Sequence, residues 1–314
     1  MIRIRPLATV AYVVLAMGLA WLVALPLWLG RGLATPGASL LLIVMMYTPA
    51  AAVLIVMLMM RPVPKGQRLR FLGMWPLRPA KRVVWLSVLG LFAPMILIAL
   101  AMLLAAALGW FPADFAGLSG YQQALEATAP AGTPLPPAGI LIAAQLIAIP
   151  FAAATINALA AFGEEVGWRG FLVPALRRYG TWPALLISGA IWGLWHAPII
   201  LLGYNFARAD ITGVLLMTGG CVAWGVLLGW LRLRSASLWP AVFAHGAMNA
   251  TMGLPLLFVA AGATFDPALA IGLGVSGWIV GAVVVVILLL AGQFRPHPQL
   301  AGPRAPKHPP APAS

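Results

Sequence analysis

Long apolar stretches that contain almost no charge dominate this 314-residue chain. Eight of them are long enough to cross a bilayer, which takes about 20 residues of helix. A backbone in lipid must satisfy its own hydrogen bonds, so stretches of this length are expected to be helices. They lie near residues 8–30, 39–60, 83–109, 140–163, 182–202, 211–231, 238–260 and 269–291. The sequence therefore predicts an all-α fold, a polytopic membrane bundle with about eight transmembrane helices.

The charge of the chain agrees with a membrane location and not with nucleic-acid binding. Apolar residue types make up 62% of the sequence and charged types 8%, yet the formal net charge is +13. A soluble domain needs a more polar exterior than this. The basic residues lie in short segments between the apolar stretches, as the positive-inside rule describes. We expect a multi-pass protein of the cell (inner) membrane without a nucleic-acid partner.

Loop charges indicate the orientation. The segment 61–82 carries seven Lys or Arg and no acid, whereas the loop 111–138 carries two acids and no base. The first is therefore expected inside and the second outside, with both termini cytoplasmic. The basic segment is expected to meet the anionic headgroups of the lipid bilayer.

The chain is expected to form one transmembrane domain over residues 1–292. The segment 293–314 is rich in Pro and Ala and is predicted to be a disordered cytoplasmic tail. Residues 166–176 stay largely apolar, so we expect a helix from about Pro150 to Arg178, with 139–149 as its outer extension or a separate short helix.

Two of the six carboxylates in the chain, Glu164 and Glu165, stand side by side within an apolar region. A charge inside hydrocarbon costs about 2.5–3.5 kcal/mol or more, so such a pair indicates a functional site. Arg169 follows Glu165 by four residues, the spacing of an ion pair along one side of a helix. Glu164 is rotated about 100° away and is free to face other helices.

His196 and His245 lie in later apolar stretches at a comparable depth. Counted from the inner loops at 1.5 Å per residue, Glu164, His196 and His245 lie about 20, 22 and 16 Å deep. Asn249 shares a helix face with His245. Pro198 cannot donate to the carbonyl four residues before it, so the helix is expected to bend beside His196. The similar depths predict one shared cavity.

Three motifs in this order resemble those of the CPBP family, the CAAX prenyl protease and bacteriocin-processing (Abi) intramembrane proteases. They are Glu164-Glu165-x-x-x-Arg169, Trp192-x-x-x-His196 and His245-x-x-x-Asn249. The resemblance covers roughly residues 140–255. The family usually has Phe where this chain has Trp192, a departure that we interpret as minor.

The resemblance implies a CAAX-type intramembrane endopeptidase, a metalloendopeptidase-like hydrolase acting on a membrane-associated or lipidated (CAAX-like) protein. It implies that Glu164 and His196 activate water and that His245 and Asn249 stabilise the oxyanion, with Glu165 and Arg169 in support. Independently of the family, amide hydrolysis needs a base for water, donors for the oxyanion and an acid for the leaving amine.

The residues leave the cofactor open. Glu164, His196 and His245 are of the types that form a three-ligand zinc site with an open position. The spacing lacks the His-x-x-x-His pair of zincins, so a metal-free glutamate mechanism is an equal alternative.

Two other functions compete with the protease. One is a catalytically silent immunity or scaffold protein that binds another membrane protein, although a scaffold has no need of a costly buried base. The other is a proton-coupled transporter that uses the same groups as a relay. Against it, the chain shows no repeated hydropathy pattern and no matched pair of broken helices.

Overall fold

The computed structural model describes residues 2–128, 130 and 134–295, and the regular elements in that part of the chain are helices. The predicted tail 293–314 lies outside the described residues from position 296 onward. A seven-residue π-helix, Val166–Leu172, separates α8 from α9. The α-helices are α1 Pro6–Leu29, α2 Ala38–Met46, α3 Thr48–Met59, α4 Arg68–Leu72, α5 Ala80–Ala107, α6 Ser119–Glu126, α7 Ala138–Ala154, α8 Ile156–Glu165, α9 Val173–Leu176, α10 Thr181–Trp195, α11 Ala197–Ile200, α12 Ile211–Ser235, α13 Trp239–Thr251, α14 Leu254–Phe258, α15 Pro267–Ala270 and α16 Val275–Leu290.

Six stretches of the described chain are helical, long and apolar enough to cross a membrane, and one bent pair of helices makes a seventh. The bent pair joins Ala138–Ala154 to Ile156–Tyr179 at an angle of 42°. The predicted all-α membrane bundle is confirmed, and the described residues contain six or seven candidate spans where about eight were expected. The six single spans are Pro6–Leu29, Ala38–Met59, Ala80–Ala107, Ile211–Ser235, Trp239–Phe258 and Pro267–Leu290.

The stretch predicted near 182–202 does not form a complete span. Its helix, α10, has 15 residues, which is about 22 Å of helix against a hydrocarbon core of roughly 30 Å. The helix ends at Trp195, His196 forms a turn, and α11 begins at Ala197. Because Pro198 has no N–H to donate, the helix is interrupted beside His196, as the sequence predicts.

The fourth predicted span breaks at Thr155 and not near Pro150. Thr155 has φ −117° and ψ −98°, which is outside the helical region, whereas Pro150 lies inside α7. The outer segment, which contains residues 139–149, is thus a separate helix, one of the two arrangements expected for it. The expectation of a continuous helix beginning at about Pro150 is wrong.

Gly246 of α13 lies directly against this break. A Cβ added at Gly246 would come 2.6 Å from the carbonyl oxygen of Ala153 and 3.0 Å from the amide nitrogen of Ala158. A glycine permits such an approach of two helix backbones, as small residues do throughout membrane bundles. The close approach sets the neighbouring His245 beside α8.

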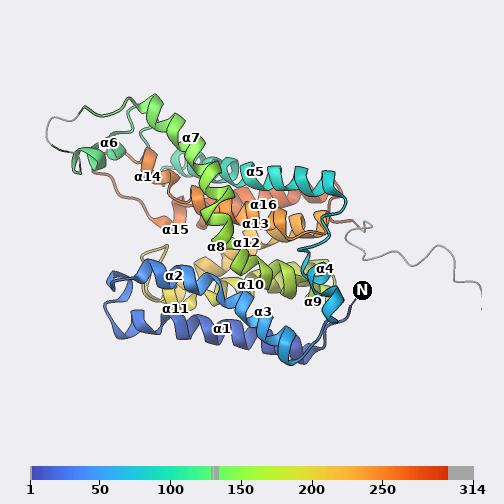
Figure 1. Cartoon of the computed structure of the whole chain (residues 1–314). Coiled ribbons are helices and arrows are strands. Elements are labelled where there is room, and N and C mark those ends of the chain that lie inside the picture. The colour runs from blue at the N-terminus through green and yellow to red at the C-terminus, as the bar shows by residue number, and fades with distance from the viewer. Residues whose placement is uncertain (1, 129, 131–133, 296–314) are drawn as a thin grey trace, which may run out of the picture.

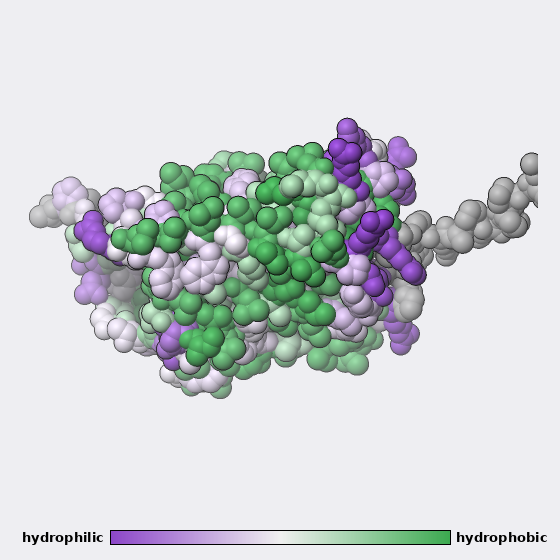
Figure 2. Space-filling view, turned by 90° about the horizontal axis from the view of Figure 1, so that it is seen from below, coloured by the Kyte–Doolittle hydropathy of each residue, from purple (hydrophilic) through white to green (hydrophobic). Residues whose placement is uncertain are grey.

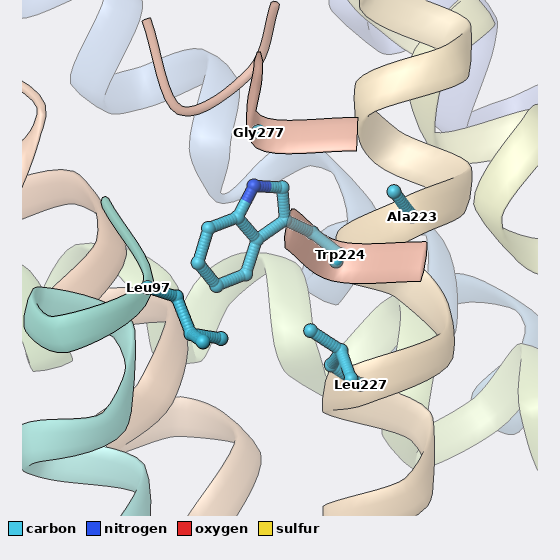
Figure 3. Close-up of a pocket in the computed structure, with 6 residues that line it drawn as sticks. Leu97, Ala223, Trp224, Leu227 and Gly277 are labelled. Atoms are coloured by element: carbon cyan, nitrogen blue, oxygen red, sulfur yellow. The ribbon is translucent and has the colours of Figure 1, made fainter. Parts of the chain in front are cut away.

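Figure 1 shows α8, α10, α12 and α13 in the middle of the bundle, with α1 to α3 on one side and α5 with α16 on the other. Trp224 of α12 fills the seam toward α5 and α16, where its indole lies between Leu97 and Gly277 (Figure 3). The indole N–H donates to the carbonyl of Gly272 over 2.9 Å. This bond ties α12 to the turn that precedes α16.

The outer surface of the bundle is apolar around its middle. Val14, Ile96 and Val283, near the middle of their helices, are 64%, 60% and 54% exposed, and Figure 2 shows hydrophobic residues across the body of the molecule. Hydrophilic residues gather at the end that carries α4, where Lys65 and Arg70 are exposed (Figures 1 and 2). The surface is one that hydrocarbon solvates, as in a membrane protein.

Candidate active site

Polar side chains from three helices meet inside the bundle. Glu164 and Glu165 come from the end of α8, Arg169 from the π-helix, and His245 from α13. Each of the four is at most 2% exposed. Buried charges persist where they are paired and hydrogen-bonded, so the partners of each group decide what the cluster can do.

The ion pair expected from the Glu165–Arg169 spacing is present. Arg169 Nη1 donates to Glu165 Oε1 over 2.7 Å. The guanidinium of Arg169 also lies 4.4 Å from the centre of the Trp192 ring, a cation–π contact. Its backbone carbonyl accepts a hydrogen bond from Arg232 Nε at 3.1 Å. Arg169 is therefore held from three sides and fixes the position of Glu165.

Glu165 also holds His245. The Nδ1–H of His245 donates to the same Oε1 of Glu165 over 2.9 Å. A carboxylate on Nδ1 fixes the tautomer and the orientation of an imidazole, which leaves Nε2 to act on other groups. Glu165 is thus more than the structural partner of Arg169, because it aims the ring of His245.

Glu164 faces His245 with one oxygen and two indoles with the other. Its Oε1 lies 4.0 Å from His245 Nε2, too far for a direct hydrogen bond but a gap that one oxygen atom bridges with bonds of about 2.8 Å. Its Oε2 accepts the indole N–H of Trp192 at 2.6 Å and that of Trp168 at 3.2 Å. The Phe that the family usually has at this position has no N–H to donate, so Trp192 adds a hydrogen bond to Glu164 that Phe cannot make.

His196 occupies a different setting from the one expected. Its Nδ1–H donates to the carbonyl of Trp192 over 2.9 Å, and its ring meets Trp195 edge-on with centroids 4.6 Å apart. Within the described residues, no ion pair or hydrogen bond joins His196 to Glu164. The structure therefore brings His245, and not His196, directly opposite the carboxylate.

Asn249 lies one turn beyond His245 on α13 and is half-buried. In the described part of the chain its side-chain amide makes no hydrogen bond to the cluster. The amide is on the same helix face as His245, with its N–H groups available to a bound molecule.

Two aromatic residues near Glu164 were missed by the sequence reasoning. Trp168 follows Glu164 by four residues, the same spacing that revealed Glu165 and Arg169, so a signal was present. Tyr12 of α1 is fully buried, and a Cβ added at Gly167 would collide with its hydroxyl. No pattern in the sequence points to Tyr12, because it lies in a distant span without a motif.

The arrangement does not fit the three-ligand metal site that the residue types allowed. Among the described residues, no group of three His, Cys, Asp or Glu side chains is placed to hold a metal ion. We therefore derive no step of the chemistry through a metal at Glu164, His196 and His245.

Comparison with known proteins agrees with the three motifs. Residues 145–251 match the family model of type II CAAX prenyl endopeptidase Rce1-like proteins, and this range contains every motif residue. CAAX prenyl protease 2 of Methanococcus maripaludis is 31% identical over 97 residues, which cover 29% of this chain and 36% of that protein. Both matches support the predicted resemblance to the CPBP family over the segment that carries the motifs. The alignment spans about a third of the length of this curated relative, so the activity of the whole protein is a separate matter.

Proposed function

We propose that this protein is an intramembrane endopeptidase that hydrolyses a peptide bond in a membrane-associated, lipidated protein. The observation that carries the proposal is the buried gap of 4.0 Å between Glu164 Oε1 and His245 Nε2, in a segment similar to CAAX prenyl proteases. A carboxylate and an oriented imidazole on either side of one oxygen atom supply a base and a donor for amide hydrolysis.

In the proposed mechanism, Glu164 Oε1 takes a proton from water as the water oxygen attacks the carbonyl carbon of the substrate. His245, aimed by Glu165, donates from Nε2 to the oxyanion, and the amide of Asn249 supplies a second donor. Arg169 balances the charge of Glu165 through their ion pair. Glu164 then passes its proton to the leaving amine, and the carbon–nitrogen bond breaks.

His196 has a less direct part in this proposal than the family resemblance implies. Its Nδ1 is engaged by the Trp192 carbonyl, so Nε2 is the atom that it offers to water or substrate. We retain His196 as a candidate second contact of the attacking water and assign the proton transfer to Glu164.

A lipidated substrate is supported by an apolar cavity of about 370 Å³ between α5, α7 and α14. Thr251, two residues beyond Asn249, belongs to its lining, together with Met102, Leu146 and Phe258. Of the helices that line it, α7 and α14 lie in the half of the bundle remote from α4 (Figure 1). We propose that the basic end is cytoplasmic, with both termini, and that the membrane is the cell membrane. In this orientation, a substrate protein anchored by its lipid in the inner leaflet extends past Asn249 toward this cavity.

The test is cleavage of prenylated peptides ending in a CAAX-like sequence by the purified protein in liposomes. Replacing the base by Glu164→Gln is expected to lower turnover at least 1,000-fold while the protein stays folded. The matched control is Asp266→Asn, which alters a half-exposed ion pair with Arg208 and is expected to cleave like the parent. Full turnover by Glu164→Gln contradicts the proposal. Absence of turnover in the folded parent with every lipidated peptide favours the silent scaffold instead.

A further inference from the structure

We propose that Trp168 and Trp192 are positioning residues that decide which oxygen of Glu164 acts on water. The inference rests on the proposed function, because it concerns the base of that reaction. Both indole N–H groups end on the same atom, Glu164 Oε2, at 3.2 and 2.6 Å. The other oxygen, Oε1, is thereby left to face His245 Nε2.

The two donors reach Glu164 from different helices, which makes the restraint on the carboxylate a rigid one. Trp168 stands in the π-helix one turn after Glu164, and Trp192 reaches across from α10. A partial turn of the carboxylate that moved an oxygen away from both indoles would break both bonds at once. Hydrogen bonds to an ionised group are about twice as strong as those between neutral groups, so the rotation is costly.

Both indoles are themselves fixed by their surroundings. Trp192 is 1% exposed, and its ring lies 5.2 Å from the ring of His245, edge to face. Trp168 has no exposed surface, and its ring packs 5.9 Å from both Tyr12 and Trp195. The two donors are therefore pre-organised and do not depend on the substrate for their position.

Other ionisable groups also surround Glu164. In the described part of the chain, none of them donates a hydrogen bond to Oε2. Glu165 and Arg169 lie on the same chain segment, and His245 faces Oε1 from α13. Tyr12 of α1, Cys221 of α12 and Tyr204 after α11 lie near enough to interact electrostatically. The indole pair is thus the part of the surroundings that distinguishes one carboxylate oxygen from the other.

The proposal is tested by replacing each indole with Phe, which keeps an aromatic ring and removes the N–H. Trp192→Phe is expected to lower kcat about 10-fold or more, and Trp168→Phe by less, because its bond is longer. KM is expected to stay unchanged. The carboxylate loses a donor that favours its ionised form, so the acidic limb of the pH–rate profile is expected to move to higher pH.

The matched control is Trp195→Phe. Trp195 is also 1% exposed and lies on α10, but its indole N–H donates to Thr48 Oγ1 over 3.1 Å and not to Glu164. Trp195→Phe is expected to leave the acidic limb where the parent has it, whatever its effect on stability. Profiles of Trp168→Phe and Trp192→Phe that coincide with that of Trp195→Phe would overturn the proposal.

A readout that needs no turnover separates this proposal from the proposed function. The infrared band of the protonated Glu164 carboxyl, assigned by its loss in Glu164→Gln, is followed as a function of pH in parent and variants. We expect the band to appear at higher pH in Trp192→Phe and Trp168→Phe than in the parent or in Trp195→Phe. A band that appears at the same pH in the parent and in both variants contradicts the indole proposal, even if Glu164→Gln is inactive. A band that appears at higher pH in the two variants supports it, even if no substrate is cleaved.

Discussion

The two buried histidines of the site belong to regions that differ in what holds the imidazole. His245 lies on the face of a continuous helix, α13, and its Nδ1 is bound by a carboxylate. His196 lies at the broken end of α10, and its Nδ1 is bound by a backbone carbonyl of its own helix. The first acceptor is ionised and the second is neutral, so the hydrogen bond that orients His245 is the stronger of the two.

The difference shows that depth in the membrane and residue type do not define a role. Both histidines were expected at a similar depth, and both are at most 8% exposed. Their surroundings nevertheless assign them different chemistry, because one faces Glu164 across 4.0 Å and the other is turned toward Trp195. Four substitutions test this comparison.

The largest effect is expected from truncating each imidazole. His245→Ala is expected to lower kcat about 100- to 1,000-fold, the usual loss when one oxyanion donor is removed. His196→Ala is expected to lower it about 10-fold. Turnover of a lipidated peptide in liposomes, with folding checked by circular dichroism, measures both. A loss in His196→Ala that equals or exceeds that in His245→Ala breaks the comparison and restores His196 to the water-activating role.

A smaller effect on turnover, with a large effect on stability, is expected from Glu165→Gln. The change leaves Arg169 buried without its carboxylate, and breaking a buried pair in this way costs about 3–5 kcal/mol. It also replaces the carboxylate that aims His245 with a neutral amide, a weaker acceptor, so kcat is expected to fall about 100-fold. Thermal unfolding in detergent and the peptide assay check the two parts. Asp266→Asn is the control for stability, because its ion pair with Arg208 is 37–42% exposed and such pairs contribute about 0–1 kcal/mol.

The smallest effect is expected from Gly246→Ala. The added methyl group would press on the backbone of α7 and α8 at Ala153 and Ala158, which is expected to cost about 1–3 kcal/mol and to displace His245. Gly253→Ala is the matched control, since a Cβ there meets nothing within 4 Å and the backbone is helical with φ −79°. Equal unfolding temperatures of the two variants would show that α13 does not depend on this close approach.

Some of the site could be predicted from local spacing, and some of it could not. The four-residue spacing predicted the Glu165–Arg169 pair correctly, because it lies within one continuous run of helical turns. The same spacing relates Glu164 to Trp168, whose indole N–H donates to the carboxylate without forming an ion pair. The interruption of the helix at His196 could be predicted from Pro198. The break between α7 and α8 at Thr155 could not, because no proline follows it closely.

The amino-acid sequence by itself determined that this chain is a helical membrane protein with a charged pair at its centre. Hydrocarbon admits a long apolar segment only as a helix, and it makes a buried carboxylate pair costly enough to be informative. Tertiary structure alone decided that His245 faces Glu164 and that the indole of Trp192 reaches its second oxygen. Those contacts join residues 28 and about 80 positions apart, and they depend on how whole helices rotate and approach one another. Helix period and apolar length carry no record of that rotation, because it is set by packing at positions such as Gly246.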